Sequence, residues 1–304
     1  MTLPRFLIIG GMKCGSTTLF RDLLTHPRVF FPLDKEPEHL TRDDVLDPAS
    51  ETRAEYEALF ARARPDQFCA EASTAYTKRP DFEGVAKRAR ALLGDDLKVI
   101  YLVREPIKRL VSHHYHSYTE GRMPADIARS VREFPELIEY SHYAHQAEPW
   151  LDELGEQDVR ILRFEDLVAD RPGVVGGLQG WLGLEPMPGR IDAGRRFNAG
   201  DSKPVATGGW KRLANNDAYR RYVRPLLPLG MKDRIRGMLL PKAPPRPDPP
   251  GPELVAELRE RLAPDLARLA ELLGRGGEDL WPAEAPDGPA RRGEASSSDS
   301  IEPI

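Results

Sequence analysis

A short apolar segment in the first tenth of the sequence runs directly into a glycine-rich turn and then into a helix-like pattern. Residues 6–24 read FLIIGGMKCGSTTLFRDLL, in which Leu19, Leu23 and Leu24 have the spacing of one helix face. Later segments repeat the order, with strand-like runs at 68–71, 98–103 and 159–164 and helical patterns at 82–93, 106–119 and 143–154. Strands that alternate with helices form parallel sheets covered by helices. We therefore predict an α/β fold with a parallel sheet flanked by helices on both faces.

The turn between the first strand and the first helix predicts a phosphate-binding site. A nucleoside triphosphatase loop has Gly, four residues and then Gly-Lys-Ser/Thr. The glycines that bound residues 10–15 have this spacing, but Ser16 stands where the lysine belongs, and Lys13 lies inside the loop. The N–H groups at a helix N-terminus bind a phosphate whatever its parent molecule, and Thr17 and Thr18 add hydroxyl donors. The predicted fold is accordingly P-loop-like.

A second anion site is predicted one strand away from this loop. A nucleoside triphosphatase needs a carboxylate at the end of a neighbouring strand to hold Mg²⁺, but the strand at 98–103 ends in Arg104. Pro106 then starts a helix, and Ser112 lies about two turns along it, on the side that faces back toward the strand end. The ligand implied has one phosphate-like group at the loop and a second anionic group near Arg104, with no metal between them.

Composition limits the classes of partner and compartment. The chain has 304 residues, a net charge of −4 and a pI near 6.0, so no basic field favours nucleic acid as the main partner. No apolar run approaches the length of a membrane span, and no signal peptide is recognisable, so we expect a cytoplasmic protein that does not insert into membranes. Two cysteines agree with a reducing compartment, although a single disulfide stays open. Oligomeric state is not predicted by any pattern.

The C-terminal third predicts a packed helix followed by a tail. A proline-rich connector at 241–252 precedes a leucine-rich pattern at 253–273, which we expect to pack back onto the domain. After Trp281 the sequence has almost nothing to bury. We therefore predict one domain over 1–282 and a disordered tail over 283–304.

Several motifs together resemble a known enzyme family. The loop GGMKCGSTTL and the later segment YLVREPIKRLVSHHYH are similar, in order and spacing, to the paired signatures of sulfotransferases that use 3′-phosphoadenosine 5′-phosphosulfate. KEPEHL at 35–40, AEASTAY at 70–76 and the segments 159–184 and 262–281 extend the similarity over most of 4–282. The chain looks closest to the glycan type, related to heparan sulfate sulfotransferases and their bacterial relatives.

The resemblance implies a role for each matching residue. Lys13 would neutralise the bridging oxygen of the phosphosulfate, and Glu36 would be the base that takes a proton from the acceptor hydroxyl. The other cofactor ligands would be Gly15, Ser16, Thr17 and Thr18 at the 5′-phosphate, and Arg104 and Ser112 at the 3′-phosphate. Where the glycan enzymes have aromatic residues after the glutamate, this chain has His39 and Leu40, which makes His39 the second candidate base. The products would be adenosine 3′,5′-bisphosphate and a sulfated acceptor.

The sequence also leaves two other classes of function open: a nucleotide or adenylylsulfate kinase, and a binding protein with the same fold but no catalysis. The acceptor could be a small molecule, a natural product or a glycan. Segments 33–66 and 119–150 are expected to form the walls of its site, and their polar and aromatic residues favour a hydroxylated acceptor with an apolar part. Examples of such residues are Arg122, Tyr140, His142, Tyr143 and Trp150.

Two further motifs have a structural interpretation. Glu165 and Asp166 could imitate a Mg²⁺ site, but they look more like acids in the first turn of a helix. Cys14, beside Lys13 and a helix N-terminus, could have a lowered pKa, although its place in the loop is a sufficient explanation.

Overall fold

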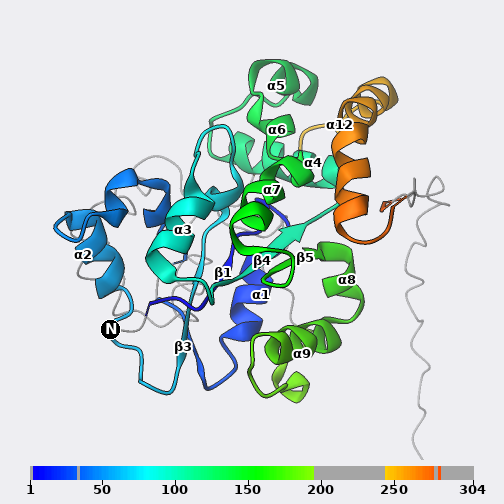
Figure 1. Cartoon of the computed structure of the whole chain (residues 1–304). Coiled ribbons are helices and arrows are strands. Elements are labelled where there is room, and N and C mark those ends of the chain that lie inside the picture. Colours follow the sequence, from blue (N-terminus) through cyan, green and yellow to red (C-terminus); the bar gives the residue numbers. More distant parts are fainter. Residues whose placement is uncertain (1–2, 33–34, 195–243, 277–279, 282–304) are drawn as a thin grey trace, which may run out of the picture.

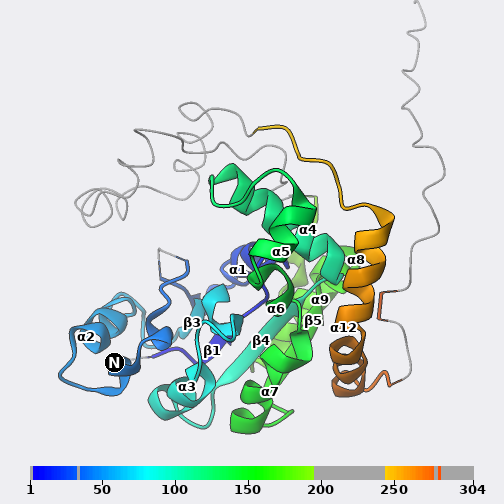
Figure 2. The ribbon, with the colours of Figure 1, turned by 90° about the horizontal axis from the view of Figure 1, so that it is seen from above.

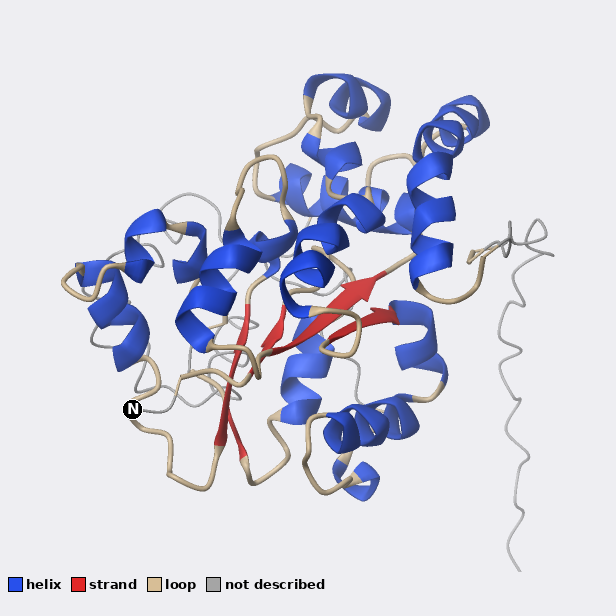
Figure 3. Ribbon diagram, in the orientation of Figure 1, coloured by secondary structure: helices blue, strands red, loops and turns tan. Residues whose placement is uncertain are grey.

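The computed structural model describes residues 3–32, 35–194, 244–276 and 280–281. Within these residues, one five-stranded sheet has the order β2-β3-β1-β4-β5, and every neighbouring pair is parallel (Figure 3). The strands are β1 (Phe6–Ile8), β2 (Val29–Phe30), β3 (Phe68–Ala72), β4 (Lys98–Val103) and β5 (Val159–Arg163). The four predicted strands, at 6–9, 68–71, 98–103 and 159–164, are therefore confirmed, each to within one residue at its ends, and β2 was not predicted.

Both faces of the sheet are buried under helices, as predicted. Alternate residues of β4 divide between two hydrophobic clusters, with Val99 and Tyr101 in one and Ile100 and Leu102 in the other. The first cluster is completed by α3 (Val85–Leu93), α7 (Tyr143–Leu154) and α12 (Pro252–Leu272), and the second by α1 (Ser16–Leu23), α8 (Phe164–Ala169) and α9 (Arg171–Trp181). Figures 1 and 2 show α3 and α7 on one side of the sheet and α1 and α9 on the other.

The remaining helices and turns surround these two layers, and several of them add buried side chains to the first cluster. They are α2 (Glu51–Ala58), α4 (Pro106–Thr119), α5 (Ile127–Glu133), α6 (Glu136–Glu139) and the short 3₁₀ turns η1 (His39–Thr41), η2 (Asp43–Leu46), η3 (Thr74–Thr77) and η4 (Pro188–Arg190). Helices α4, α5, α6 and α12 share a third hydrophobic cluster, which includes Leu110, Ile127 and Leu258. Across the described ranges, no helix combines the length and apolar composition that a bilayer crossing requires.

Helix α12 packs back onto the domain, as its leucine pattern predicted. Leu258, Leu262 and Leu269 have no exposed surface. The Asp265 carboxylate accepts hydrogen bonds from the backbone N–H groups of Ala144 and His145, at 3.0 and 2.9 Å, and so satisfies donors at the start of α7. The predicted tail at 283–304 lies outside the described residues, so the division at 282 stays a prediction.

Candidate anion-binding and catalytic site

The loop after β1 presses its backbone against β4. The Gly11 N–H donates to the Leu102 carbonyl at 2.7 Å, and a Cβ added at Gly10 would come within 2.8 Å of the Leu102 Cβ. Glycine is therefore needed at position 10 because no side chain fits there. This close approach fixes where the chain leaves the sheet and turns toward α1.

Two residues of the loop have left-handed backbone conformations. Lys13 has a φ of 72° and Gly15 a φ of 90°. Gly15 is the N-cap of α1 and makes no side-chain cap, so the first N–H groups of the helix are left for solvent or a ligand. A Cβ at Gly15 would lie 2.6 Å from the Phe164 ring, which begins α8 beyond the end of β5. The shape of the loop thus depends on the left-handed backbone at Lys13 and Gly15 and on the neighbouring Phe164 ring.

Arg104 reaches this loop from the end of β4. Its Nη1 donates to the Lys13 carbonyl at 3.2 Å, and its Cζ lies 4.9 Å from the centroid of the Phe164 ring. Its Nε is buried and has no hydrogen-bond partner among the described residues. A buried guanidinium donor without a partner is unfavourable unless a ligand completes it. Arg104 therefore fits the role of an anion ligand.

Lys35 is a contact of the loop that the sequence reasoning missed. Its Nζ donates to Ser16 Oγ at 2.9 Å, to Thr17 Oγ1 at 3.3 Å and to Glu36 Oε1 at 2.8 Å. The structure thus brings to one ammonium group the hydroxyl of Thr17, which was predicted to bind phosphate, the hydroxyl of Ser16, of which only the backbone was predicted, and the predicted base. Thr18, by contrast, is half-buried in α1, and its N–H donates to the Gly15 carbonyl at 2.9 Å.

Glu36 is held between Lys35 and the start of η3. Its Oε2 accepts from the Thr74 N–H at 2.7 Å and from the Thr74 hydroxyl at 2.8 Å. Burial disfavours its charged form, but the Lys35 ammonium and the Thr74 hydrogen bonds outweigh burial and hold the pKa of Glu36 below its ordinary value. Its φ of 64° places it in the left-handed region, where strain in a non-glycine residue often accompanies function.

His39, the second candidate base, has different neighbours. Its Nε2 is 3.8 Å from the Glu55 carboxylate, and its ring lies 5.5 Å from the Tyr56 ring. Burial lowers its pKa, with the Glu55 charge acting in the opposite direction. None of its contacts among the described residues reaches the loop. The geometry therefore favours Glu36 over His39 as the candidate base, because Glu36 is joined to the loop through Lys35.

A buried carboxylate on β3, Glu71, occupies the other strand next to β1. Its oxygens accept hydrogen bonds from the hydroxyls of Tyr56, Tyr76 and Ser73, the Tyr56 and Ser73 bonds being 2.7 and 2.8 Å long. Burial raises the pKa of Glu71 to about 7, against the lowering effect of these donors. Because its oxygens are already paired with hydroxyl donors, Glu71 does not provide the open Mg²⁺ ligand of a nucleoside triphosphatase.

Ser112 is not joined to the other predicted residues by a hydrogen bond. It is half-buried in α4, one turn before Tyr115, whose hydroxyl donates to the Pro244 carbonyl of the connector at 3.0 Å. Its own hydroxyl has no hydrogen bond within the described part of the chain. The role of Ser112 at a 3′-phosphate therefore stays a prediction.

The acidic pair after β5 is structural, as its sequence context indicated. Glu165 accepts from the Glu105 N–H at 3.0 Å and from the Trp281 indole at 2.9 Å, and Asp166 pairs with Arg163. Both acids lie in the first turn of α8. They join the end of β5 to the N-cap of α4 and to the segment at 280–281.

The structure agrees with the structural interpretation of Cys14, but two of the residues predicted to wall the acceptor site were misassigned. The Cys14 thiol is fully buried, and burial raises its pKa to about 12, so the nearby positive charges do not produce a thiolate; neither Cys14 nor Cys69 forms a disulfide among the described residues. Tyr143 and Trp150 are 0% and 1% exposed and pack in the core, because their rings complete the α7 side of the sheet rather than a site wall. Of the residues first suggested as walls, Arg122 is exposed and His142 is half-buried.

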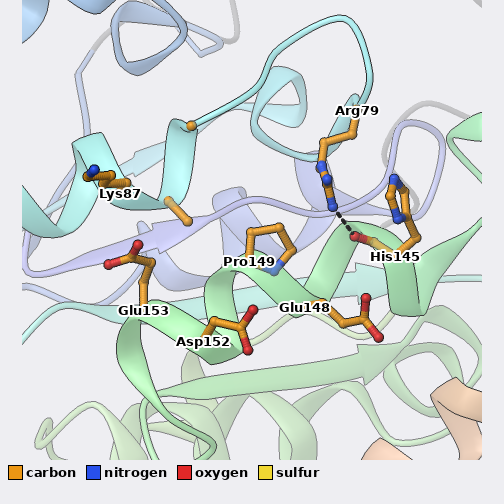
Figure 4. A pocket seen from close by; sticks show the side chains of 9 residues that line it. Arg79, Lys87, His145, Glu148, Pro149, Asp152 and Glu153 are labelled. Carbon is orange, nitrogen blue, oxygen red and sulfur yellow. Dashed lines mark hydrogen bonds between the residues drawn. The ribbon is translucent and has the colours of Figure 1, made fainter.

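A hollow of about 570 Å³ lies away from these residues. It is lined by Arg79 and Gly84, by Ala86 and Lys87 of α3 and by His145, Glu148, Pro149, Asp152 and Glu153 of α7. Figure 4 shows cationic and anionic side chains around it and the hydrogen bond from Arg79 to the His145 carbonyl. Because it contains neither the loop nor Arg104 nor Glu36, it is separate from the candidate site.

Residues 3–196 match the family described as the sulfotransferase domain. The match covers more than half of the chain, so the protein belongs to this family, as the paired motifs indicated.

Curated relatives and a solved structure agree with this membership. Human heparan sulfate glucosamine 3-O-sulfotransferase 6 is 26% identical over 196 residues, which cover 60% of this chain and 53% of the relative. Human heparan sulfate glucosamine 3-O-sulfotransferase 3B1 is 24% identical over 249 residues, which cover 74% of this chain and 60% of the relative. The chain thus spans a little over half the length of the curated relatives it matches. A sulfotransferase crystal structure from Alicyclobacillus acidocaldarius shares the fold, with a TM-score of 0.62, 22% identity and coverage of 90% of this chain and 97% of that one.

Proposed function

We propose that the protein transfers a sulfuryl group from 3′-phosphoadenosine 5′-phosphosulfate to a hydroxyl of a small-molecule, natural-product or glycan acceptor. The observation that carries the proposal is the convergence of three groups at one edge of the sheet. These are the loop after β1, Glu36 next to the end of β3, and Arg104 at the end of β4. Membership of the sulfotransferase domain family supports the same reaction.

The cofactor would be held at two places. The open N–H groups at the start of α1, with the hydroxyls of Ser16 and Thr17, would bind the 5′-phosphate. Arg104, whose buried Nε needs a partner, would bind the 3′-phosphate, with Ser112 as the second predicted ligand. When bound, the cofactor supplies the activated sulfuryl group, and the protein orients it and balances its charge.

The reaction is an in-line displacement at sulfur. A bond forms between the acceptor oxygen and sulfur, the bond from sulfur to the bridging oxygen breaks, and the electron pair stays on the 5′-phosphate. Lys13 would balance the charge that develops on that oxygen; removing one preorganised donor of this kind commonly costs about 10² to 10³ in turnover. Glu36 would take the acceptor proton, a step worth about 10² to 10⁴ in rate.

The phosphotransferase alternative is disfavoured by the residues on the strands beside β1. On β4 the strand end carries Arg104, and on β3 the carboxylate of Glu71 is enclosed by three hydroxyl donors. Neither strand offers the exposed carboxylate that would hold Mg²⁺ in a kinase site. A binding protein without catalysis stays the second alternative, and a turnover assay distinguishes it.

The names of the curated relatives favour a glycan among the possible acceptors. Both human relatives are heparan sulfate glucosamine 3-O-sulfotransferases by name. The family resemblance implies that many eukaryotic relatives have a lysine after the glutamate matching Glu71, where this chain has Ala72, so a contact to an acidic glycan is expected to be missing. We therefore propose a hydroxylated acceptor of lower charge than heparan sulfate.

A binding and turnover experiment tests the proposed function. Adenosine 3′,5′-bisphosphate should raise the melting temperature, whereas ATP with Mg²⁺ should not. Labelled cofactor, incubated with a panel of sugars, phenols and glycopeptides, should then transfer label to at least one acceptor. EDTA should leave turnover unchanged, because Lys13 and Arg104 supply the positive charge. Stabilisation by ATP with Mg²⁺ alone would instead support the phosphotransferase.

A further inference from the structure

The Lys35 side chain crosses from the segment before η1 to the first turn of α1. Its ammonium lies 2.9 Å from Ser16 Oγ, 3.3 Å from Thr17 Oγ1 and 2.8 Å from Glu36 Oε1. The side chain is only 18% exposed, so the charge is partly withdrawn from solvent. An ammonium has three donors, and each is paired here; a bound anion would take over the donor of the longest bond, the one to Thr17 Oγ1.

This arrangement places an ammonium beside Ser16, the loop position at which the sequence has no lysine. Nucleoside triphosphatase loops carry a lysine immediately before the Ser/Thr, and this chain has Ser16 at that position. Lys35 delivers an ammonium to Ser16 through space, from a different part of the chain. The loop therefore has two lysines available to it, Lys13 within its sequence and Lys35 from outside.

The hydrogen bonds also set the direction of the two hydroxyls. Because Lys35 donates to the oxygens of Ser16 and Thr17, each hydroxyl proton is left to donate elsewhere. Both residues start α1, where N–H groups and the helix dipole already favour an anion. Charge and donors thus act together on whatever the loop binds.

We propose that Lys35 is a second cationic ligand of the phosphosulfate group at the loop and holds Glu36 beside that group. The proposal rests on the proposed function, because it takes the anion in the loop to be this cofactor. Lys35 would donate both to the cofactor and to Glu36. The acceptor hydroxyl would then lie between Glu36, which takes its proton, and the sulfur atom that the hydroxyl oxygen attacks. Its ammonium also reduces the repulsion between Glu36 and the bound anion.

Calorimetry with two nucleotides tests the assignment. Lys35→Met should weaken binding of adenosine 3′,5′-bisphosphate about 10-fold to 100-fold, the usual cost of a lost charge-assisted hydrogen bond. It should leave binding of adenosine 3′-monophosphate unchanged, because that nucleotide has no 5′-phosphate. Lys35→Arg, which keeps the charge, should recover part of the affinity. Lys87→Met removes an exposed lysine of α3 and is the matched control.

The outcomes separate this inference from the proposed function. If the wild-type protein binds no adenosine 3′,5′-bisphosphate, the proposed function is wrong and the inference fails with it. If the wild type binds it and Lys35→Met binds it equally well, only the Lys35 assignment is wrong. Equal losses for both nucleotides in Lys35→Met and Lys35→Arg would also overturn the assignment, because they would indicate a general disturbance of the site.

Discussion

The ring of Phe164 lies under the guanidinium of Arg104, with 4.9 Å between the Arg104 Cζ and the ring centroid. The same ring faces Gly15 so closely that a Cβ there would be 2.6 Å from Cδ2. One aromatic side chain at the end of β5 therefore positions both parts of the candidate anion site, the loop after β1 and the arginine after β4.

Gly15→Ala should weaken adenosine 3′,5′-bisphosphate binding by at least about tenfold. The substitution meets Phe164 and also places a side chain at a positive φ, which costs about 1–2 kcal/mol. Gly183→Ala is the matched control, since Gly183 has a φ of 75° but no heavy atom within 4 Å of an added Cβ. Both variants should lose stability in urea denaturation, and only Gly15→Ala should lose affinity by calorimetry. Equal affinities in the two variants would show that Phe164 does not shape the loop.

Arg104→Ala should distinguish the two phosphates of the nucleotide. Binding of adenosine 3′,5′-bisphosphate should weaken about 10-fold to 100-fold, because a charge-assisted contact is lost. Adenosine 5′-monophosphate, which has no 3′-phosphate, should lose less than about threefold. Arg104→Lys keeps the charge but loses the planar guanidinium, so its affinity for adenosine 3′,5′-bisphosphate should lie between those of the wild type and Arg104→Ala. Equal calorimetric losses for both nucleotides would assign Arg104 to supporting the loop through the Lys13 carbonyl instead.

Glu36→Gln should lower turnover by about 10² to 10⁴ and change nucleotide affinity by less than about threefold, because the amide keeps the size but not the basicity. An acceptor with a more acidic hydroxyl, such as an activated phenol, should restore part of the rate. Lys13→Ala should not be rescued in this way, because Lys13 acts on the leaving oxygen. Glu38→Gln, in the same segment, is the control and should keep most of the turnover. Near wild-type turnover in Glu36→Gln would make His39 the next base to test.

Glu71 should make the protein less stable as the pH rises. Its carboxyl pKa is raised from 4.5 to about 7 by burial, so between these values the folded state keeps a proton that the unfolded state has lost. The stabilising contribution is complete below pH 4.5 and is lost as the pH rises through about 7. Relative to Glu71→Gln, which mimics the protonated form, the wild-type free energy of unfolding should fall by about 2–3 kcal/mol between pH 5 and 8.

Urea denaturation of both proteins across this pH range measures the difference. Glu253→Gln replaces an exposed glutamate of α12 and serves as the control for the substitution itself. A constant difference between wild type and Glu71→Gln at all pH values would show that Glu71 stays charged in the fold.

The long elements could be predicted from the sequence because their patterns are local. Strand β4 is a continuous apolar run, and α4 starts at Pro106, a residue suited to the first helical position. Strand β2 has two residues, Val29 and Phe30, which are too few to show any period. Tyr143 and Trp150 were misassigned because a polar tip on an aromatic ring gives no information about which neighbours bury it.

The candidate site was predictable only in part. The glycine spacing and Arg104 identified the two anion positions, since both follow from motifs at strand ends. Lys35 was missed because its contacts join residues 18 and 19 positions apart, and only the folded chain brings them together. Its position next to Glu36 was the one available signal, a cation adjoining the predicted base.

The order of the elements along the chain also has a consequence for folding during synthesis. The described sheet is complete at Arg163, whereas α12 begins at Pro252. At about 5–20 residues per second, translation needs roughly 4 to 18 seconds to cover the interval. Over that time the nascent chain can form the sheet and the loop, while the apolar surface beneath Leu258 and Leu262 is uncovered and the donors at Ala144 and His145 lack Asp265. The vulnerable stage of this fold is therefore expected after the sheet has formed and before α12 docks.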